Sequence, residues 1–126
     1  MKALLLLLAA AQAGAQTSDG QVQFARSCAA CHQADGAGVA GAFPALKGNA
    51  FVQGEAATVI ATVLKGRGGM PAFAASLDDQ NIALVLSYMR QAWGNQAGPI
   101  DAEQVQTVRT IVKADTKRHG RNKVGH

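Results

Sequence analysis

The sequence predicts an all-α protein with a single folded domain. Several segments repeat apolar residues with the period of an amphipathic helix, and no segment alternates apolar and polar residues as a half-buried β-strand does. The chain of 126 residues has the length of one domain. Aromatic residues make up only 5% of it, and a body of about 100 residues buries only about 60–65% of its unfolded surface. We therefore expect something besides side chains to fill the centre.

The first fifteen residues have the pattern of an export signal. Lys2 precedes the apolar run Leu4–Ala11, and small residues at positions 13–15 supply a cleavage pattern. The run is much shorter than the roughly 20 residues that a membrane-spanning helix needs. We expect cleavage after Ala15, a periplasmic location and no membrane span. A buried N-terminal helix or an uncleaved anchor is the alternative.

Two helices are expected in the first half of the chain. The first runs from Asp19, a candidate N-cap, to about Ala30. The second covers residues 55–65 and ends at Gly66; its apolar face is formed by Ala56, Val59, Ile60, Val63 and Leu64. Residues 33–54 are rich in Gly and Ala and show no period. They are expected to form loops.

Two more helices are expected in the second half. The third begins at Asp78 or Asp79 and ends near Gly94; its apolar stripe is Ile82, Val85, Leu86, Met89 and Trp93. Asp101 and Gln104 resemble a capping box for a fourth helix, whose apolar residues are Val105, Val108, Ile111 and Val112. The apolar pattern stops after Ala114.

The net charge is concentrated at the C-terminal end. Residues 16–114 carry seven basic and seven acidic residues, whereas residues 115–126 carry four basic residues against one acidic residue. We expect residues 16–114 to be the folded domain and residues 115–126 to be a basic, disordered tail. A second interpretation is that the tail attracts an acidic partner or an anionic membrane surface. Nucleic acid is not an expected partner, because no aromatic residue lies among these cations for bases to stack on.

The chemistry-bearing motif is CAACH at residues 28–32. Two cysteines three positions apart, followed at once by a histidine, form the attachment pattern of c-type haem. Cys28 and Cys31 would form thioethers with the haem vinyl groups, and His32 would give one axial nitrogen to the iron. Attachment outside the cytoplasm agrees with the export signal.

Three other interpretations of the two cysteines are weaker. A structural zinc site needs four ligands, and beyond this motif the chain offers only His119 and His126. A thioredoxin-like redox pair needs a βαβ setting that the helical pattern does not provide. A plain disulfide in an exported protein would leave the small core unexplained.

Met70 is the candidate for the second axial ligand. It follows Gly66, Gly68 and Gly69 in a loop between two helices, where glycines let the backbone approach a haem closely. Met89 lies on an apolar helix stripe and is expected to be core filler.

Three motifs in order carry a resemblance to a known family: CAACH at 28–32, GAFPAL at 41–46 and GMPAF at 69–73. Together they resemble the class I cytochrome c family of small bacterial monohaem electron carriers, over residues 19 to about 95. The resemblance implies a small class I cytochrome c fold with three main helices around a covalently bound haem. The fourth helix would be an addition to that fold. Residues 87–99 resemble haem domains that accompany periplasmic dehydrogenases.

The resemblance also implies roles for individual residues. Pro44 matches the family proline whose carbonyl accepts a hydrogen bond from the other ring nitrogen of the haem histidine, which would orient His32. Four residues match the crossing of the first and third helices: Gly20, Phe24, Val85 and Tyr88.

The expected function is electron transfer rather than catalysis. A monomer would carry one electron on one haem c, ligated by His32 and Met70, between larger redox proteins such as a dehydrogenase, reductase or oxidase. One alternative is a ligand-binding or peroxidatic haem protein with a labile Met70; another is a fixed cytochrome subunit of a dehydrogenase complex. The candidates for contact with the haem propionates, by position alone, are Asn49, Lys65, Arg67 and Trp93.

Overall fold

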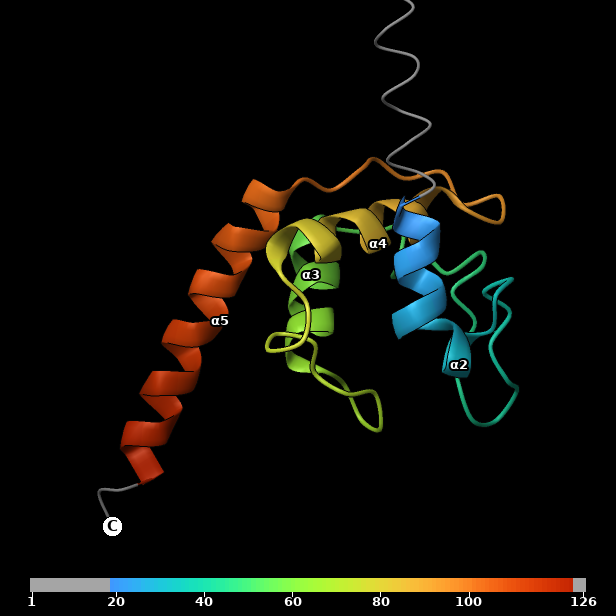
Figure 1. Cartoon of the computed structure of the whole chain (residues 1–126). Helices are drawn as coiled ribbons and strands as arrows, with labels where there is room; N and C mark the ends of the chain where they lie inside the picture. The colour runs from blue at the N-terminus through green and yellow to red at the C-terminus, as the bar shows by residue number, and fades with distance from the viewer. Residues whose placement is uncertain (1–18, 124–126) are drawn as a thin grey trace, which may run out of the picture.

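The computed structural model describes residues 19–123, and this part of the chain is helical without a β-strand (Figure 1). The expected signal peptide, residues 1–15, lies outside the described residues. Residues 19–27 form a helix, named here the N-terminal helix. It is followed by α2 (Ala29–His32), α3 (Ala56–Lys65), α4 (Asp79–Gln91) and α5 (Ala102–Lys123). The expected all-α fold is confirmed.

The N-terminal helix crosses α4 at very short distance. Gly20 is buried, and a Cβ atom there would lie 2.5 Å from the Leu84 carbonyl oxygen and 2.8 Å from the Tyr88 Cβ. A side chain would therefore prevent this approach. The expected close crossing exists, and the Leu84 backbone and the Tyr88 Cβ are the groups nearest to Gly20. Asp19 is already helical, so it is not the N-cap.

An aromatic cluster joins the N-terminal helix to the end of α4. The Phe24 ring lies 5.6 Å from that of Tyr88 and 5.1 Å from that of Trp93, and both pairs are tilted rather than stacked. Such edge-to-face pairs add stability beyond simple burial. Trp93 reaches the cluster from outside α4. This helix ends at Gln91 rather than near Gly94, and Trp93 has a positive φ of 55°.

The expected caps of α4 and α5 are present. The Asp78 side chain accepts a hydrogen bond of 2.8 Å from the Asn81 amide. At the start of α5, Gln104 donates its amide to Asp101 and its side chain accepts from the Asp101 amide, at 2.8 and 2.9 Å. This reciprocal pair is a capping box.

The first half of α5 packs against the body and the second half does not. Val105 and Val108 are buried, and Val112 is partly buried against the core. We name these three residues the packing face of α5. Ile111, expected to be part of it, is 56% exposed because it points to one side of this face. In Figure 1 the lower half of α5 extends away from the other helices.

The expected disorder from residue 115 is contradicted, because α5 continues to Lys123. Residues 113–123 are all exposed. The sequence criterion failed because it relied on the loss of apolar residues, whereas a helix that is already nucleated and packed can continue through polar residues.

Two buried polar side chains hold the loops around the core. Arg90, 6% exposed, donates to the carbonyl oxygens of Val52, Gly54 and Gly98. Asn95, 4% exposed, ties together the 46–48 loop and the end of α4 through hydrogen bonds with Leu46, Gly48 and Met89. Met89 is buried, as expected for core filler.

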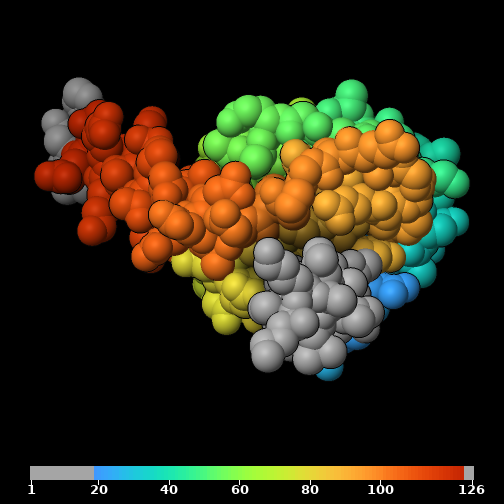
Figure 2. Space-filling view, turned by 90° about the horizontal axis from the view of Figure 1, so that it is seen from above, coloured from blue at the N-terminus to red at the C-terminus, as the bar shows by residue number. Residues whose placement is uncertain are grey.

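Seen from above in Figure 2, the far end of α5 and the loops after α2 lie at opposite ends of the molecule. Figure 1 shows the same separation. Across residues 19–123, no helix combines the length and the apolar character that crossing a bilayer requires.

Candidate haem site

Cys28, Cys31 and His32 lie on one helical turn. The N-terminal helix is interrupted at Cys28, and α2 continues from the next residue. The Cys28 carbonyl accepts from the amides of Cys31 and His32, at 3.2 and 3.0 Å. This turn holds the two sulfurs and the imidazole in a compact group, which is the arrangement that the attachment motif requires.

Both cysteines are free thiols in the structure. Burial, and to a smaller extent the neighbouring Cys31, raises the pKa of the Cys28 thiol to about 11. Redox pairs of the thioredoxin type work with a lowered thiol pKa, so this environment argues against that interpretation. Among residues 19–123, no three His, Cys, Asp or Glu side chains gather to hold a metal ion. The donor set therefore does not suit a structural zinc site.

The imidazole of His32 is oriented by the expected partner. Its Nδ1 lies 2.9 Å from the Pro44 carbonyl oxygen. Because a carbonyl can only accept, Nδ1 must carry a proton, and in the neutral imidazole Nε2 then has the free lone pair. That tautomer is the one that a metal-binding histidine uses. The hydrogen bond from Nδ1 to the carbonyl also raises the donor strength of Nε2.

The loop that carries Pro44 is fixed at both ends. After His32 the backbone turns at Gly36 and Gly38, which have φ of 69° and 65°. A Cβ atom on Gly36 would lie 2.6 Å from the Trp93 ring, so only glycine fits beneath that ring. Trp93 Nε1 also donates to the Ala34 carbonyl at 3.2 Å. The aromatic cluster thus supports the loop that orients His32.

Met70 lies in the loop between α3 and α4. A tight turn joins Arg67 and Met70 through two backbone hydrogen bonds of 3.0 and 3.2 Å. Gly66, with φ of 74°, allows this turn, since a Cβ there would lie 2.6 Å from the Met70 carbonyl oxygen. The Met70 side chain is partly buried against the core. Its place opposite His32 stays a prediction.

Arg109 of α5 holds the segment that follows Met70. Its guanidinium forms a salt bridge of 2.7 Å with Asp79 and donates to the carbonyl oxygens of Ala74 and Leu77. The Arg109 side chain is only 15% exposed. The fourth helix, an addition to the fold that the resemblance implies, therefore braces the end of the Met70 loop.

The four candidates for contact with the propionates differ in their free hydrogen-bonding capacity. Asn49 accepts from the amides of Phe51 and Val52 and donates to the Ala45 carbonyl, so its side chain already has a structural role. The Trp93 donor is engaged by Ala34. Lys65 and Arg67 are exposed, although Arg67 also lies 5.6 Å from the centre of the Phe51 ring.

Haem is large, flat and mostly apolar, and exposed apolar side chains are present in the loops that follow His32. Val39, Phe43 and Phe51 are between 39% and 43% exposed and belong to the loops after His32. Cys28, Met70 and Phe73 are partly buried against the core. Two thiols and an oriented imidazole on one turn, with apolar side chains on the loops, are the groups that a haem requires, so the residues present fit it.

Sequence reasoning missed Arg90, Asn95 and Arg109. The sequence did contain a signal for Arg109. This residue directly follows Val108 on the packing face, and a charged residue beside a buried one is expected to have a polar partner. Asn95 had none, because two of its three hydrogen bonds join backbone groups 47 and 49 positions away.

Comparisons with known proteins agree with this geometry. The family model described as cytochrome c oxidase, cbb3-type, subunit III matches residues 15–89. Cytochrome c-552 of Thermus thermophilus is 34% identical, over 86% of this chain and 84% of its own length. The cytochrome c subunit of a quinone alcohol dehydrogenase from Gluconobacter oxydans is 36% identical, over 77% of this chain.

The cytochrome subunit of a fructose dehydrogenase from Gluconobacter japonicus is 33% identical over 75% of this chain. The alignments with the alcohol dehydrogenase subunits cover only 21–23% of those relatives. The family is shown by the match over residues 15–89 and by the relative aligned over most of both lengths. With its CAACH turn and helical fold, the chain belongs to the cytochrome c family.

Proposed function

We propose that this protein is an electron carrier that holds one covalently attached haem c with His32 and Met70 as axial ligands. The observation that carries the proposal is the 2.9 Å contact between His32 Nδ1 and the Pro44 carbonyl. His32 lies on the same turn as the two cysteines. The contact with the Pro44 carbonyl orients the ring and leaves Nε2 as the nitrogen available to a metal, as in histidines that bind metals.

The bound haem supplies an iron that gains and loses one electron. His32 provides a fixed nitrogen donor. Met70 provides a soft thioether, which favours the reduced state and raises the reduction potential. The buried side chains of α3 and α4 exclude water, and this also disfavours the more highly charged oxidised state. Cys28 and Cys31 lie on a partly exposed turn, where a redox partner can approach.

The partners we propose are larger redox proteins, and a dehydrogenase is favoured by the relatives that are dehydrogenase subunits. Such a carrier acts as a monomer without catalytic activity of its own, and it is exported after cleavage at Ala15. Lys65 and Arg67 are the cations we propose for the propionates, because their side chains are exposed.

The first experiment is a visible absorption spectrum of the protein expressed with a haem-attachment system, oxidised and reduced, with and without CO. A covalent low-spin haem that does not bind CO supports the function as an electron carrier. A covalent haem that binds CO readily favours the ligand-binding or peroxidatic alternative with a labile Met70. Absence of haem would contradict both.

Met70→Ala tests the second ligand directly. The variant should keep covalent haem, show a lower reduction potential and bind CO. Met89→Leu is the matched control, because Met89 is 7% exposed in the core and the exchange conserves volume. Met70 is not the ligand if its variant retains the wild-type potential and excludes CO as the control does.

A further inference from the structure

The exposed second half of α5 carries a cationic surface that electron transfer does not explain. Residues 113–123 contain five Lys or Arg residues and one acidic residue, Asp115. The preceding residues 16–112 carry one basic residue fewer than acidic ones. The positive charge is therefore collected on a helix segment that is exposed along its whole length within residues 19–123.

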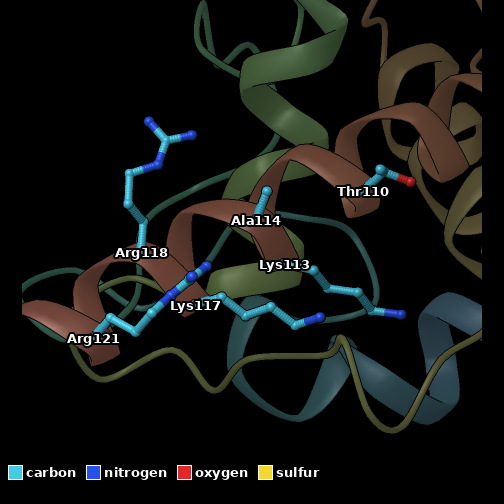
Figure 3. Close-up of a pocket in the computed structure, with 6 residues that line it drawn as sticks. All are labelled: Thr110, Lys113, Ala114, Lys117, Arg118 and Arg121. Carbon is cyan, nitrogen blue, oxygen red and sulfur yellow. The ribbon is translucent and has the colours of Figure 1, made fainter.

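Three of these cations form a line. Lys113, Lys117 and Arg121 are spaced by four residues, so they follow one another along one side of a helix. Figure 3 shows them along α5, with Arg118 turned toward another side. They line an open hollow together with Thr110, Ala114 and Arg118. We name Lys113, Lys117 and Arg121 the cationic stripe.

Two members of the cationic stripe, Lys117 and Arg121, point away from the body, and Lys113 flanks the packing face. Lys117 follows Val108 by nine residues, and Arg121 follows Val112 by nine residues. Nine residues are two and a half turns, so each cation lies on the side of α5 opposite a residue of the packing face. Asp115 does not neutralise the stripe, since its carboxylate lies 3.9 Å from Arg118. A flat surface can therefore meet Lys117 and Arg121 without obstruction by the folded body.

Stabilisation of the helix end does not account for the stripe. Cations favour the C-terminus of a helix through its dipole, but the effect is confined to the last turn. Lys113 and Lys117 precede the last turn of α5, which ends at Lys123. A helix without tertiary contacts gains no stability from adjacent positive charges, which repel each other at this spacing.

The composition of the stripe favours a flat anionic surface over a protein. Protein interfaces are centred on aromatic or large apolar side chains that lose water. Residues 113–123 contain no aromatic residue and no apolar residue larger than Ala114. They offer charge on a convex helix, which suits contact with many phosphate groups at once. The absence of a large apolar face also means that the helix would lie on such a surface rather than insert into it.

The position of the stripe also separates it from electron transfer. In Figures 1 and 2 the end of α5 lies at the opposite end of the molecule from α2, which carries Cys31 and His32. Contact through the stripe therefore leaves the haem-attachment turn free for a redox partner. We propose that the cationic stripe of α5 is a docking surface for the anionic phospholipid headgroups of a membrane.

The test is cosedimentation of the haem-loaded protein with vesicles. One set contains phosphatidylglycerol and phosphatidylcholine, and the other contains phosphatidylcholine alone. Each Lys or Arg held at an anionic bilayer strengthens binding about five-fold. The variant Lys117→Gln with Arg121→Gln should therefore weaken binding to the anionic vesicles about 25-fold. Wild-type binding should also disappear near 1 M salt, where the Debye length falls to about 3 Å.

The matched control is Arg26→Gln with Lys47→Gln, which removes the same charge from exposed sites on the body. It should change binding less than two-fold. Equal loss in both double variants would overturn the proposal, because net charge would then be responsible. Failure of the wild type to bind anionic vesicles would overturn it as well. If vesicles fail but immobilised polyglutamate retains the wild type through the same residues, an acidic protein is the partner instead.

Discussion

Replacing Arg109 by Ala should be the most damaging single change in α5. The guanidinium is 15% exposed and forms a 2.7 Å salt bridge with Asp79, which is 30% exposed. It also donates to two main-chain carbonyls, Ala74 and Leu77. Hydrogen bonds to a charged group contribute roughly 1.5–3 kcal/mol each. Loss of one partner from a buried ion pair costs about 3–5 kcal/mol.

Partial exposure lowers that figure, because water can replace part of the lost bonding. We therefore expect Arg109→Ala to lower the free energy of unfolding by about 3 kcal/mol. For a domain of about 100 residues this corresponds to roughly 12–20 °C in the midpoint of thermal unfolding. Urea titration at equal haem content measures the change. Arg109→Lys keeps the positive charge but loses the planar guanidinium with its several donors. It should therefore be roughly 1 kcal/mol more stable than Arg109→Ala.

Arg26→Ala is the control for loss of an arginine from an exposed helix surface, and it should change stability by less than about 0.5 kcal/mol. A loss below about 1 kcal/mol in Arg109→Ala would refute the reasoning. The contacts with Ala74, Leu77 and Asp79 would then be surface interactions, and α5 would not brace the segment after Met70.

Two other substitutions test the packing around the site. Gly20→Ala places a Cβ atom 2.5 Å from the Leu84 carbonyl oxygen and should lower the free energy of unfolding by about 2–3 kcal/mol, because the two helices must separate. Gly120→Ala is the control, since a Cβ there meets nothing within 4 Å. Equal thermal midpoints for the two variants would contradict the close crossing. Asn95→Ala leaves the amide of Gly48 and the carbonyls of Leu46 and Met89 without their partner, so we expect a loss of about 2–4 kcal/mol in urea titration. A loss no greater than that of an exposed Asn122→Ala would show that water replaces those bonds.

The local features of this fold could be predicted from sequence because each depends on neighbours in the chain. The face of α3, the Asp78 cap and the Asp101–Gln104 capping box depend on residues within two or three turns. The close crossing at Gly20 was reached by another route, through a resemblance. The structure has this crossing, and it adds that the Leu84 backbone comes nearest to Gly20.

The errors have a common physical origin. The end of α4 was placed two or three residues too late, because Trp93 fits the apolar stripe and nothing local shows that its backbone turns to a φ of 55°. The residues that the sequence did not predict, Arg109 and Asn95, act through tertiary contacts. Arg109 reaches residues 30–35 positions away, and Asn95 reaches positions 47 and 49 away. No periodicity in the sequence reports such partners.

The two halves of α5 have separate physical roles on one rigid element. Val105, Val108 and Arg109 fasten the first half to the segment after Met70, so this part of the helix has a fixed direction relative to the body. The second half keeps that direction only while it remains helical, because it makes no tertiary contacts within the described residues. An isolated helix of this length is marginal in water. Contact of the cationic stripe with anionic headgroups would remove the repulsion between its charges and stabilise the helix, so docking and helix order would reinforce each other.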